Sequence, residues 1–343
     1  MSDLTPLKNT LTSLGFTLEA EQPHLLGERH LTRPLGGGHK WLLLGRNVQG
    51  QRVVIKASNE PMGVAEIVRE RECRRVLHVI YFAYGVFLSP KEILFTTKDG
   101  YTVLVTEFVE AKPFLERPLE EQFTLALKAF KAQESAHATT SSHVRLIRGT
   151  FDELHATDYL KKINTYAHEV VPHATFKDAS DFLSQHQEVI EQYCNFLTHW
   201  DLTPQNMRVV GDSIYLLDHS SLHFGNKYEG WARFINFMTL YNPLLAHALV
   251  QYVRDNRTPE ESLALKCMRL YRLGELVRYY VGWLEHTEGN LRKLAQIRII
   301  FWDTVLQAVL HDAEVPGETI EHYKKTRDTL RSEEEKKRQV NLH

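Results

Sequence analysis

Hydrophobic spacing divides the chain into a strand-rich first third and a helical remainder. Apolar residues alternate or run together in short segments separated by turn residues, which predicts strands at 30–35, 40–47, 52–58, 85–97 and 101–110. A glycine run, Gly36, Gly37 and Gly38, separates the first two of these strands. Helical spacing predicts a short helix over 4–15, ended by Gly15, and a longer one over 63–80.

After residue 110 the pattern becomes helical. Apolar residues recur at helical spacing, which predicts helices over 119–138, 178–197, 231–255, 259–287 and 291–310. A loop with short strands interrupts them at 196–224, and a charged helical tail follows over 318–340. We therefore predict an α+β fold with a β-rich lobe at 1–108, a larger helical lobe at 109–320 and a tail at 321–343.

Composition narrows the class of protein. The chain has 343 residues, 43% hydrophobic and 24% charged, so a packed core in two lobes is expected. A net charge of -2 without a basic face argues against nucleic-acid binding. The three cysteines are far apart, which argues against disulfides and favours a reducing compartment. Without a signal-like start or an apolar run of about 20 residues, we expect a cytoplasmic protein outside the membrane.

Candidate chemistry concentrates in "FLTHWDLTPQNMRVVGDSIYLLDHSSLHF", residues 196–224. It holds His199, Asp201, Asn206 and, after an apolar run, Asp218. Phosphoryl transfer from ATP needs a base near the acceptor hydroxyl and a neutralised triphosphate. Asp201 is the candidate base, and the oxygens of Asn206 and Asp218 suit Mg²⁺.

The strand-rich third offers matching groups for a nucleotide. Lys56 ends an apolar strand, where its charge would reach the α and β phosphates, and Glu70 on the following helix would hold it. Glu66, one turn earlier, is a second candidate for that pairing. Gly36, Gly37 and Gly38 would let backbone N–H groups approach the phosphates. The segment 105–110, with Glu107 and Val109, would contact the adenine at the junction of the lobes.

The order of these parts resembles the protein-kinase-like superfamily. His199-Trp-Asp-Leu-Thr-Pro-Gln-Asn206 has the H-x-D-x-x-x-x-N form of the kinase catalytic loop. The chain looks most like the branch of aminoglycoside phosphotransferases and choline kinases. That resemblance implies that His199 and Asp201 take the catalytic-loop positions, Asn206 and Asp218 hold Mg²⁺, and Lys56 contacts ATP phosphates.

The sequence departs from that pattern at several positions. His219 and Ser220 follow the metal-site Asp218, Trp200 replaces a small or basic residue, and Thr203 stands where protein-serine kinases carry Lys. Only Glu229 stands where the branch usually has an Asp that braces the catalytic loop.

We predict an ATP- and Mg²⁺-dependent phosphotransferase acting on a small-molecule hydroxyl. The acceptor stays open among aminoglycosides, choline, sugars, amino alcohols and nucleosides, and GTP could replace ATP. A pseudokinase that binds nucleotide without turnover is the alternative from another class, and Thr203 argues against a protein kinase. The pairs His219/His223 and His137/His143 are interpreted as structural, because no further metal-ligand motif accompanies them.

Overall fold

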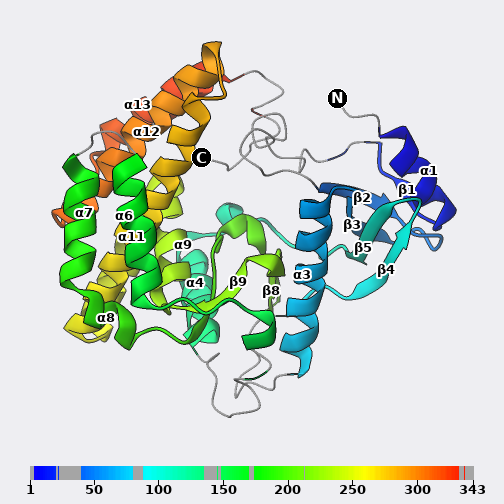
Figure 1. Ribbon diagram of the computed structural model, residues 1–343, viewed down its shortest axis with the longest axis horizontal. Helices are drawn as coiled ribbons and strands as arrows, with labels where there is room; N and C mark the ends of the chain where they lie inside the picture. The colour runs from blue at the N-terminus through cyan, green and yellow to red at the C-terminus, as the bar shows by residue number, and fades with distance from the viewer. Residues whose placement is uncertain are drawn as a thin grey trace.

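The computed structural model describes residues 4–20, 22, 40–79, 88–134, 145, 148–169, 174–211, 213–331 and 336. Its N-terminal lobe is a five-stranded antiparallel sheet in the order β1-β2-β3-β5-β4 (Figure 1). The predicted strand at 30–35 and the glycines Gly36, Gly37 and Gly38 lie outside the described residues. The elements of this lobe are α1 (Thr5–Ser13), β1 (Thr17–Leu18), β2 (Trp41–Arg46), β3 (Arg52–Ser58), α3 (Pro61–Val79), β4 (Glu92–Lys98) and β5 (Tyr101–Glu107).

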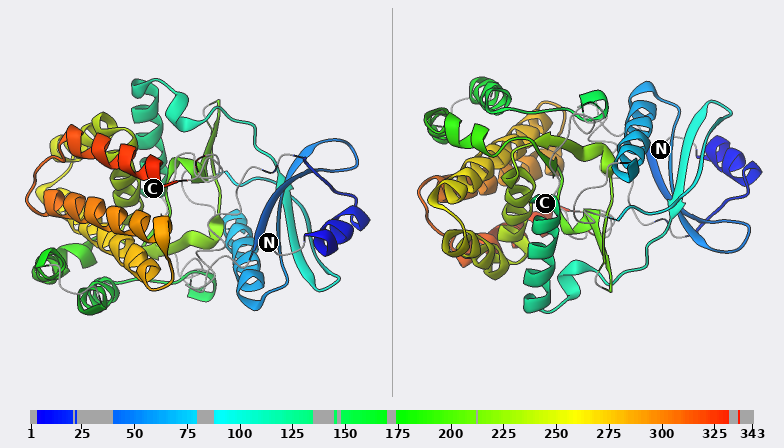
Figure 2. Two further views of the ribbon diagram at one scale, coloured as in Figure 1. Left: turned by 90° about the horizontal axis from the view of Figure 1, so that it is seen from above. Right: turned by 90° about the horizontal axis from the view of Figure 1, so that it is seen from below.

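Strand alternation decides which side chains face which helix. The sheet lies between α1 and α3 (Figure 2). Leu43, Ile55 and Val105 point to one face, where they pack in a core with residues of α1. Lys56 follows Ile55 and therefore points to the opposite face, toward α3. The sheet thus places this lysine between itself and the helix that carries Glu70.

The predicted turn between the last two strands is confirmed. Asp99 and Gly100 both have positive φ, 50° and 80°, between β4 and β5. Two residues with positive φ match the twist of a tight hairpin, and Asp and Gly tolerate that conformation best.

The C-terminal lobe is larger and mostly helical, as predicted (Figure 1). Two small antiparallel pairs, β6 with β9 and β7 with β8, form its junction with the sheet-containing lobe. Its elements are η2 (Phe114–Glu116), α4 (Leu119–Glu134), α6 (Ala156–Glu169), α7 (Ala174–Gln185), α8 (Gln187–Gln192), β6 (Phe196–His199), η3 (Pro204–Asn206), β7 (Met207–Val210), β8 (Ser213–Leu216), η4 (His219–Ser221), β9 (Leu222–Gly225), α9 (Tyr228–Tyr241), α10 (Pro243–Asn256), α11 (Pro259–Leu284), α12 (Gly289–Leu310) and α13 (Gly317–Leu330).

Two of the predicted helices are divided in the structure. The segment 231–255 breaks at Asn242, whose extended backbone precedes Pro243 and whose side chain accepts a hydrogen bond from Leu245 N at 3.2 Å. A residue before proline disfavours helical geometry, so the break follows from the sequence. The segment 178–197 forms α7, then α8, and then joins β6 after Asn195, which has φ of 71°.

The C-terminal end of the helical lobe extends into the predicted tail. The expected boundary between residues 320 and 321 falls inside α13. Ile320 and Tyr323 of this helix are buried, and the Tyr323 ring stacks on Phe301 of α12 with centroids 4.1 Å apart. We propose that the helical lobe continues at least to Leu330.

The two lobes meet through α3 and the segment before β4. Arg69 Nε of α3 donates to the Ser220 carbonyl of η4 at 3.1 Å. Leu88 exchanges backbone hydrogen bonds of 2.9 Å with Ile214 and Leu216 of β8.

No helix in the described ranges is both long enough and apolar enough to cross a bilayer.

Candidate active site

His199 connects the two loops that carry the candidate acidic residues. Its ring is buried at the end of β6, with Nε2 3.2 and 3.1 Å from the carbonyl oxygens of Leu217 and Asp218. Because both partners are acceptors, Nε2 carries the proton, and Nδ1 accepts from Asp201 N at 3.1 Å. Burial lowers the pKa of His199, which keeps it neutral in this arrangement. The geometry therefore favours a positioning role for His199.

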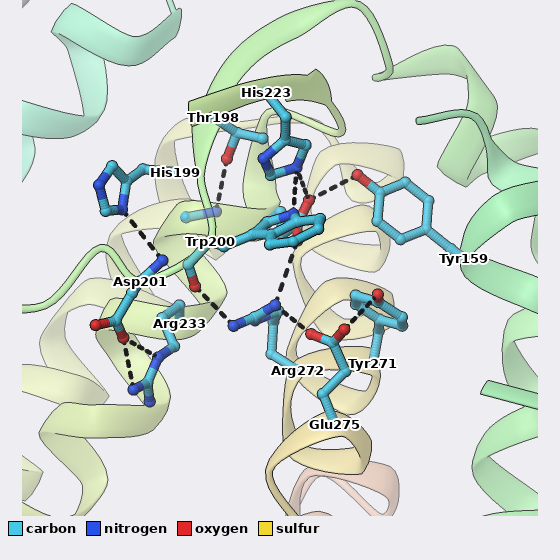
Figure 3. A network of polar contacts seen from close by, with 12 residues as sticks. Tyr159, Thr198, His199, Trp200, Asp201, His223, Arg233, Tyr271, Arg272 and Glu275 are labelled. Carbon is cyan, nitrogen blue, oxygen red and sulfur yellow. Dashed lines mark hydrogen bonds and ion pairs between the residues drawn. The ribbon is translucent and has the colours of Figure 1, made fainter. Parts of the chain in front are cut away.

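Asp201 has two differently occupied carboxylate oxygens. Its side chain is 46% exposed. Oδ2 accepts from Asn206 Nδ2 at 2.9 Å, while Oδ1 accepts from Arg233 Nε at 2.9 Å and Nη2 at 2.7 Å (Figure 3). Desolvation raises the pKa of the Asp201 carboxyl, but the Arg233 guanidinium outweighs it and holds that pKa below its ordinary value. The Asp201 carboxyl, the candidate base, is therefore ionised, and its Oδ1 is paired with the Arg233 guanidinium.

Asn206 and Asp218 are brought together by the strands between them. Leu217 N donates to the Asn206 carbonyl at 2.8 Å, which fixes the two side chains on adjacent backbone. Asn206 uses its amide N–H₂ on Asp201, so its Oδ1 remains, and no donor among the described residues bonds it. The part of the chain that the structure describes holds no cluster of three or more His, Cys, Asp or Glu suited to a metal. Asn206 and Asp218 nevertheless supply the hard oxygen donors that Mg²⁺ prefers.

Asp218 adopts a conformation that few residues other than glycine take. Its φ of 53° and ψ of 56° lie in the left-handed region, which Asp tolerates better than most side chains. The residues after it hold the carboxylate, because Ser220 Oγ donates to Oδ1 at 3.0 Å and Ser221 Oγ to Oδ2 at 3.1 Å. Ser220, one of the departures from the kinase pattern, thus supplies a hydroxyl donor to Asp218. His219 itself is buried.

Two lysines converge on Asp218. Lys56 Nζ lies 3.4 Å and Lys40 Nζ 3.5 Å from Asp218 Oδ1. Lys56 also bonds Glu70, as predicted, whereas Glu66 pairs with Lys40 at 3.0 Å. Burial raises the pKa of Asp218, but the two lysine charges outweigh it and lower that pKa strongly. Two Lys–Glu pairs therefore lie side by side between the sheet and α3.

Glu107 and Val109, the two residues expected to contact the adenine, differ in whether their backbone groups are already hydrogen-bonded. Glu107 N donates to the Lys91 carbonyl at 3.0 Å, and Glu107 Oε1 accepts from Lys91 N at 2.9 Å. These bonds tie Glu107 to the segment before β4. The backbone N–H and C=O groups of Val109 form no hydrogen bond with another described residue. Of the two residues, Val109 therefore has the backbone groups that remain available to a ligand.

Glu229 is the centre of a buried network next to the loop 199–206. Its side chain is fully buried; Oε2 accepts from Tyr159 OH at 2.7 Å and lies 2.8 Å from His223 Nε2. Trp200 Nε1 donates to the same nitrogen at 2.7 Å. Arg272 Nη1 is 3.5 Å from Glu229 Oε1, and Arg272 Nη2 donates to the Trp200 carbonyl at 2.6 Å. Glu229 thus supports the loop through Trp200.

The structure adds site residues that the sequence did not single out. These are Lys40, Arg233 and Arg272. Lys40 directly precedes β2, and a cation next to a glycine run was the available signal. Arg233 and Arg272 belong to helices whose spacing indicates only core packing. Their proximity to Asp201 and Trp200 depends on how α9 and α11 pack.

Comparison with known proteins finds similarity in structure alone. No known family profile and no curated protein matches the sequence. Aminoglycoside phosphotransferase APH(4)-Ia is similar with a TM-score of 0.60, at 13% identity over 90% of this chain and 99% of that chain. Macrolide 2'-phosphotransferase MphH from Brachybacterium faecium gives 0.57, at 14% identity over 86% and 98%.

A third solved structure agrees with these two. The GDP complex of aminoglycoside 2'-phosphotransferase-IIIa gives a TM-score of 0.60, at 11% identity over 89% of this chain and 99% of that chain. The chain therefore has the two-lobed, protein-kinase-like fold of these phosphotransferases.

Proposed function

We propose that this protein is a kinase that transfers the γ-phosphoryl group of ATP to a hydroxyl group of a small molecule. The observation that carries the proposal is the convergence of Lys56, Asp218, Asn206 and Asp201 where the two lobes meet. Cations for a triphosphate, oxygen donors for a metal and an ionised carboxylate are the groups that phosphoryl transfer requires. Solved structures of the same fold include complexes with ADP, AMP-PNP and GDP.

Each residue has a definite part in the proposed reaction. The acceptor oxygen forms a bond to the γ-phosphorus, the bond from that phosphorus to the bridging oxygen breaks, and ADP leaves. Asp201 accepts the proton of the acceptor hydroxyl. Lys56, held by Glu70, neutralises phosphate oxygens, and Val109 contacts the adenine. The predicted glycine loop, Gly36, Gly37 and Gly38, contributes backbone N–H groups.

Asn206 and Asp218 would hold the Mg²⁺ that accompanies the nucleotide. The metal neutralises charge on the phosphates when bound. Asn206 is suited to this role because its amide nitrogen is already turned toward Asp201, which directs Oδ1 elsewhere. Asp218 is suited because its ionised form is held by hydroxyl and ammonium donors.

A thermal-shift titration with ATP, with and without Mg²⁺, tests the nucleotide site. A ligand that binds the native state at a hundredfold excess over its Kd stabilises it by about 2.7 kcal/mol. We expect a Mg²⁺-dependent shift in the wild type that is lost in Asp218→Ala. Asp178→Asn, at an exposed position of α7, serves as the control. The same shift in wild type and Asp218→Ala would contradict the metal role.

One observation favours a second candidate, a nucleotide-binding regulatory module without turnover. Arg233 occupies the candidate base through two hydrogen bonds. ADP production with a panel of hydroxylated acceptors separates the two functions. The kinase requires turnover that Asp201→Asn reduces by about 10²–10⁴-fold, the usual contribution of a general base. A regulatory module would bind ATP, and Asp201→Asn would change no catalytic rate.

A further inference from the structure

The side of Asp201 that faces the helical lobe is lined by cations. Oδ2 points to Asn206, on the proposed metal side, and Oδ1 points to Arg233 of α9. Arg272 of α11 follows, because it donates to the carbonyl of Trp200, the residue before Asp201 (Figure 3). An acceptor hydroxyl that reaches Asp201 from the helical lobe therefore passes beside Arg233. Arg272 is only 12% exposed, and its terminal nitrogens already bond two glutamates and the Trp200 carbonyl.

Lys162 of α6 extends this lining. Its Nζ lies 4.7 Å from the ring centroid of Trp200, a residue that is 36% exposed. No carboxylate of the described residues lies within ion-pair distance of Lys162. A cation above an aromatic face is stabilised there and keeps its charge available to a ligand. Trp200 and Lys162 together form an apolar floor with a positive edge.

The carboxylates of the same network are turned inward and already bonded. Glu229 is fully buried and contacts Tyr159 and His223. Glu275 accepts from Tyr271 OH at 2.7 Å and pairs with Arg272. Neither offers the exposed negative charge that a polycationic acceptor requires. Within the network of Figure 3, Asp201 is the carboxylate left for a ligand, and Arg233 competes for it.

Building on the kinase activity proposed above, we propose that the acceptor is a hydroxylated small molecule that carries a carboxylate or phosphate group. That group binds Arg233 and Lys162, and the acceptor hydroxyl is presented to Asp201. Guanidinium groups bind carboxylate and phosphate in a bidentate manner, so Arg233 has an alternative partner once such an acceptor is bound. The anionic group then releases Asp201 from its ion pair. A cationic acceptor lacks this exchange and is repelled by the same two side chains.

Binding can be measured on a matched series of sugars that differ in charge. The series is glucuronate, glucose 6-phosphate, glucose and glucosamine, with hygromycin B as a polycation, all at constant ionic strength in the presence of ATP analogue and Mg²⁺. Trp200 fluorescence reports occupancy, and Trp200→Phe gives the background from the other tryptophans. We expect a saturable response to an anionic member with a Kd at least about tenfold below that of glucosamine.

Lys162→Gln tests the lining without disturbing the buried network. We expect it to weaken binding of the anionic sugar by about three- to tenfold and to leave ATP binding unchanged. Lys161→Gln, at the exposed neighbouring position of α6, should change neither. Equal or tighter binding of glucosamine or hygromycin B overturns the proposal, as does the lack of a saturable response to both anionic sugars.

The two proposals fail in different ways. Phosphorylation of hygromycin B with ADP release would support the kinase and overturn the anionic acceptor. Anion binding that depends on Lys162, combined with no turnover of any acceptor, would support the anion site and contradict the kinase. ATP binding, measured separately, shows whether a variant still has its nucleotide site.

Discussion

At the scale of the residue, Asp218 shows how the site balances its charges. Lys40 and Lys56 both approach Oδ1 of this carboxylate, while Ser220 donates a hydrogen bond to Oδ1 and Ser221 donates one to Oδ2. Each lysine also pairs with a glutamate, Lys56 with Glu70 and Lys40 with Glu66, so two ammonium groups face three carboxylates between the lobes. A Mg²⁺ ion at Asp218 would take over that carboxylate, so we expect both lysines to contact phosphate oxygens when ATP–Mg²⁺ binds.

Substitution of Lys40 tests this second phosphate contact. A hydrogen bond to a charged group contributes about 1.5–3 kcal/mol, so Lys40→Met should weaken ATP–Mg²⁺ binding by about 10- to 100-fold. Its partner Glu66 is 41% exposed, so water can solvate the carboxylate that the variant leaves unpaired. Isothermal titration calorimetry measures the affinity.

The matched control for Lys40 is Lys177→Met, which removes an exposed lysine paired with Asp181 on α7. It should leave ATP affinity unchanged. Equal ATP affinities of wild type and Lys40→Met would show that Lys40 does not contact the phosphates and that Lys56 binds them without it.

Individual site residues differ in how far the sequence predicts them. Lys56 and Glu70 follow from local rules, because strand alternation and helix spacing direct both to one side of the sheet. Asp201, Asn206 and Asp218 follow from a motif of fixed spacing. Arg233 reaches Asp201 across 32 positions of sequence. Such a contact depends on helix packing, and no local spacing rule describes it.

At the scale of the element, β9 and α9 depend on a close approach at Gly225. A Cβ at this position would lie 2.3 Å from Tyr159 OH, which donates to Glu229 and accepts from Asn226 N at 2.9 Å. Gly225→Ala should therefore displace Tyr159 and lower the free energy of unfolding by about 1–3 kcal/mol, the usual cost of overpacking. Urea denaturation measures that change.

A glycine elsewhere provides the comparison for Gly225. A Cβ at Gly317, at the start of α13, meets no atom within 4 Å. Gly317→Ala should leave stability unchanged or raise it slightly, because alanine favours the helix. Equal stability of the two variants would mean that Tyr159 moves without cost. The network next to the loop 199–206 would then be less rigid than its contacts indicate.

The ends of the helices show which local sequence signals are enough to locate an element boundary. Pro243 marks the end of α9 in the sequence, because proline disfavours helix at the preceding residue, although the spacing of apolar residues predicts one helix over 231–255. The division between α7, α8 and β6 has no such marker. There the chain turns at Asn195 in the left-handed region, and Leu197 pairs with Phe224 of β9. Pairing with a strand 27 positions later overrides the helical spacing of this segment.

At the scale of the whole molecule, the junction of the lobes contains two buried neutral histidines. Burial lowers the pKa of His199, and it lowers that of His219 well below the ordinary value, with Arg74 and other cations adding to the effect. Nε2 of His219 has no hydrogen-bond partner among the residues that the structure describes. Both rings lie among groups that join the sheet-containing lobe to the helical lobe. Protonating either ring would therefore place a buried positive charge at this junction, and at His219 the neighbouring Arg74 and Lys56 would repel it.

These histidines predict that acid destabilises the fold below about pH 6.5, the value for an unperturbed histidine. Below that pH the unfolded chain binds protons that the native state excludes, so the free energy of unfolding falls as pH falls. Each histidine contributes a slope of up to about 1.4 kcal/mol per pH unit until its native-state pKa is reached. Urea midpoints between pH 5 and 8 measure the slope. His219→Leu should reduce it by the contribution of one proton, whereas the exposed His322→Asn should leave it unchanged. An equal slope in wild type and His219→Leu would show that His219 takes up its proton in the native state.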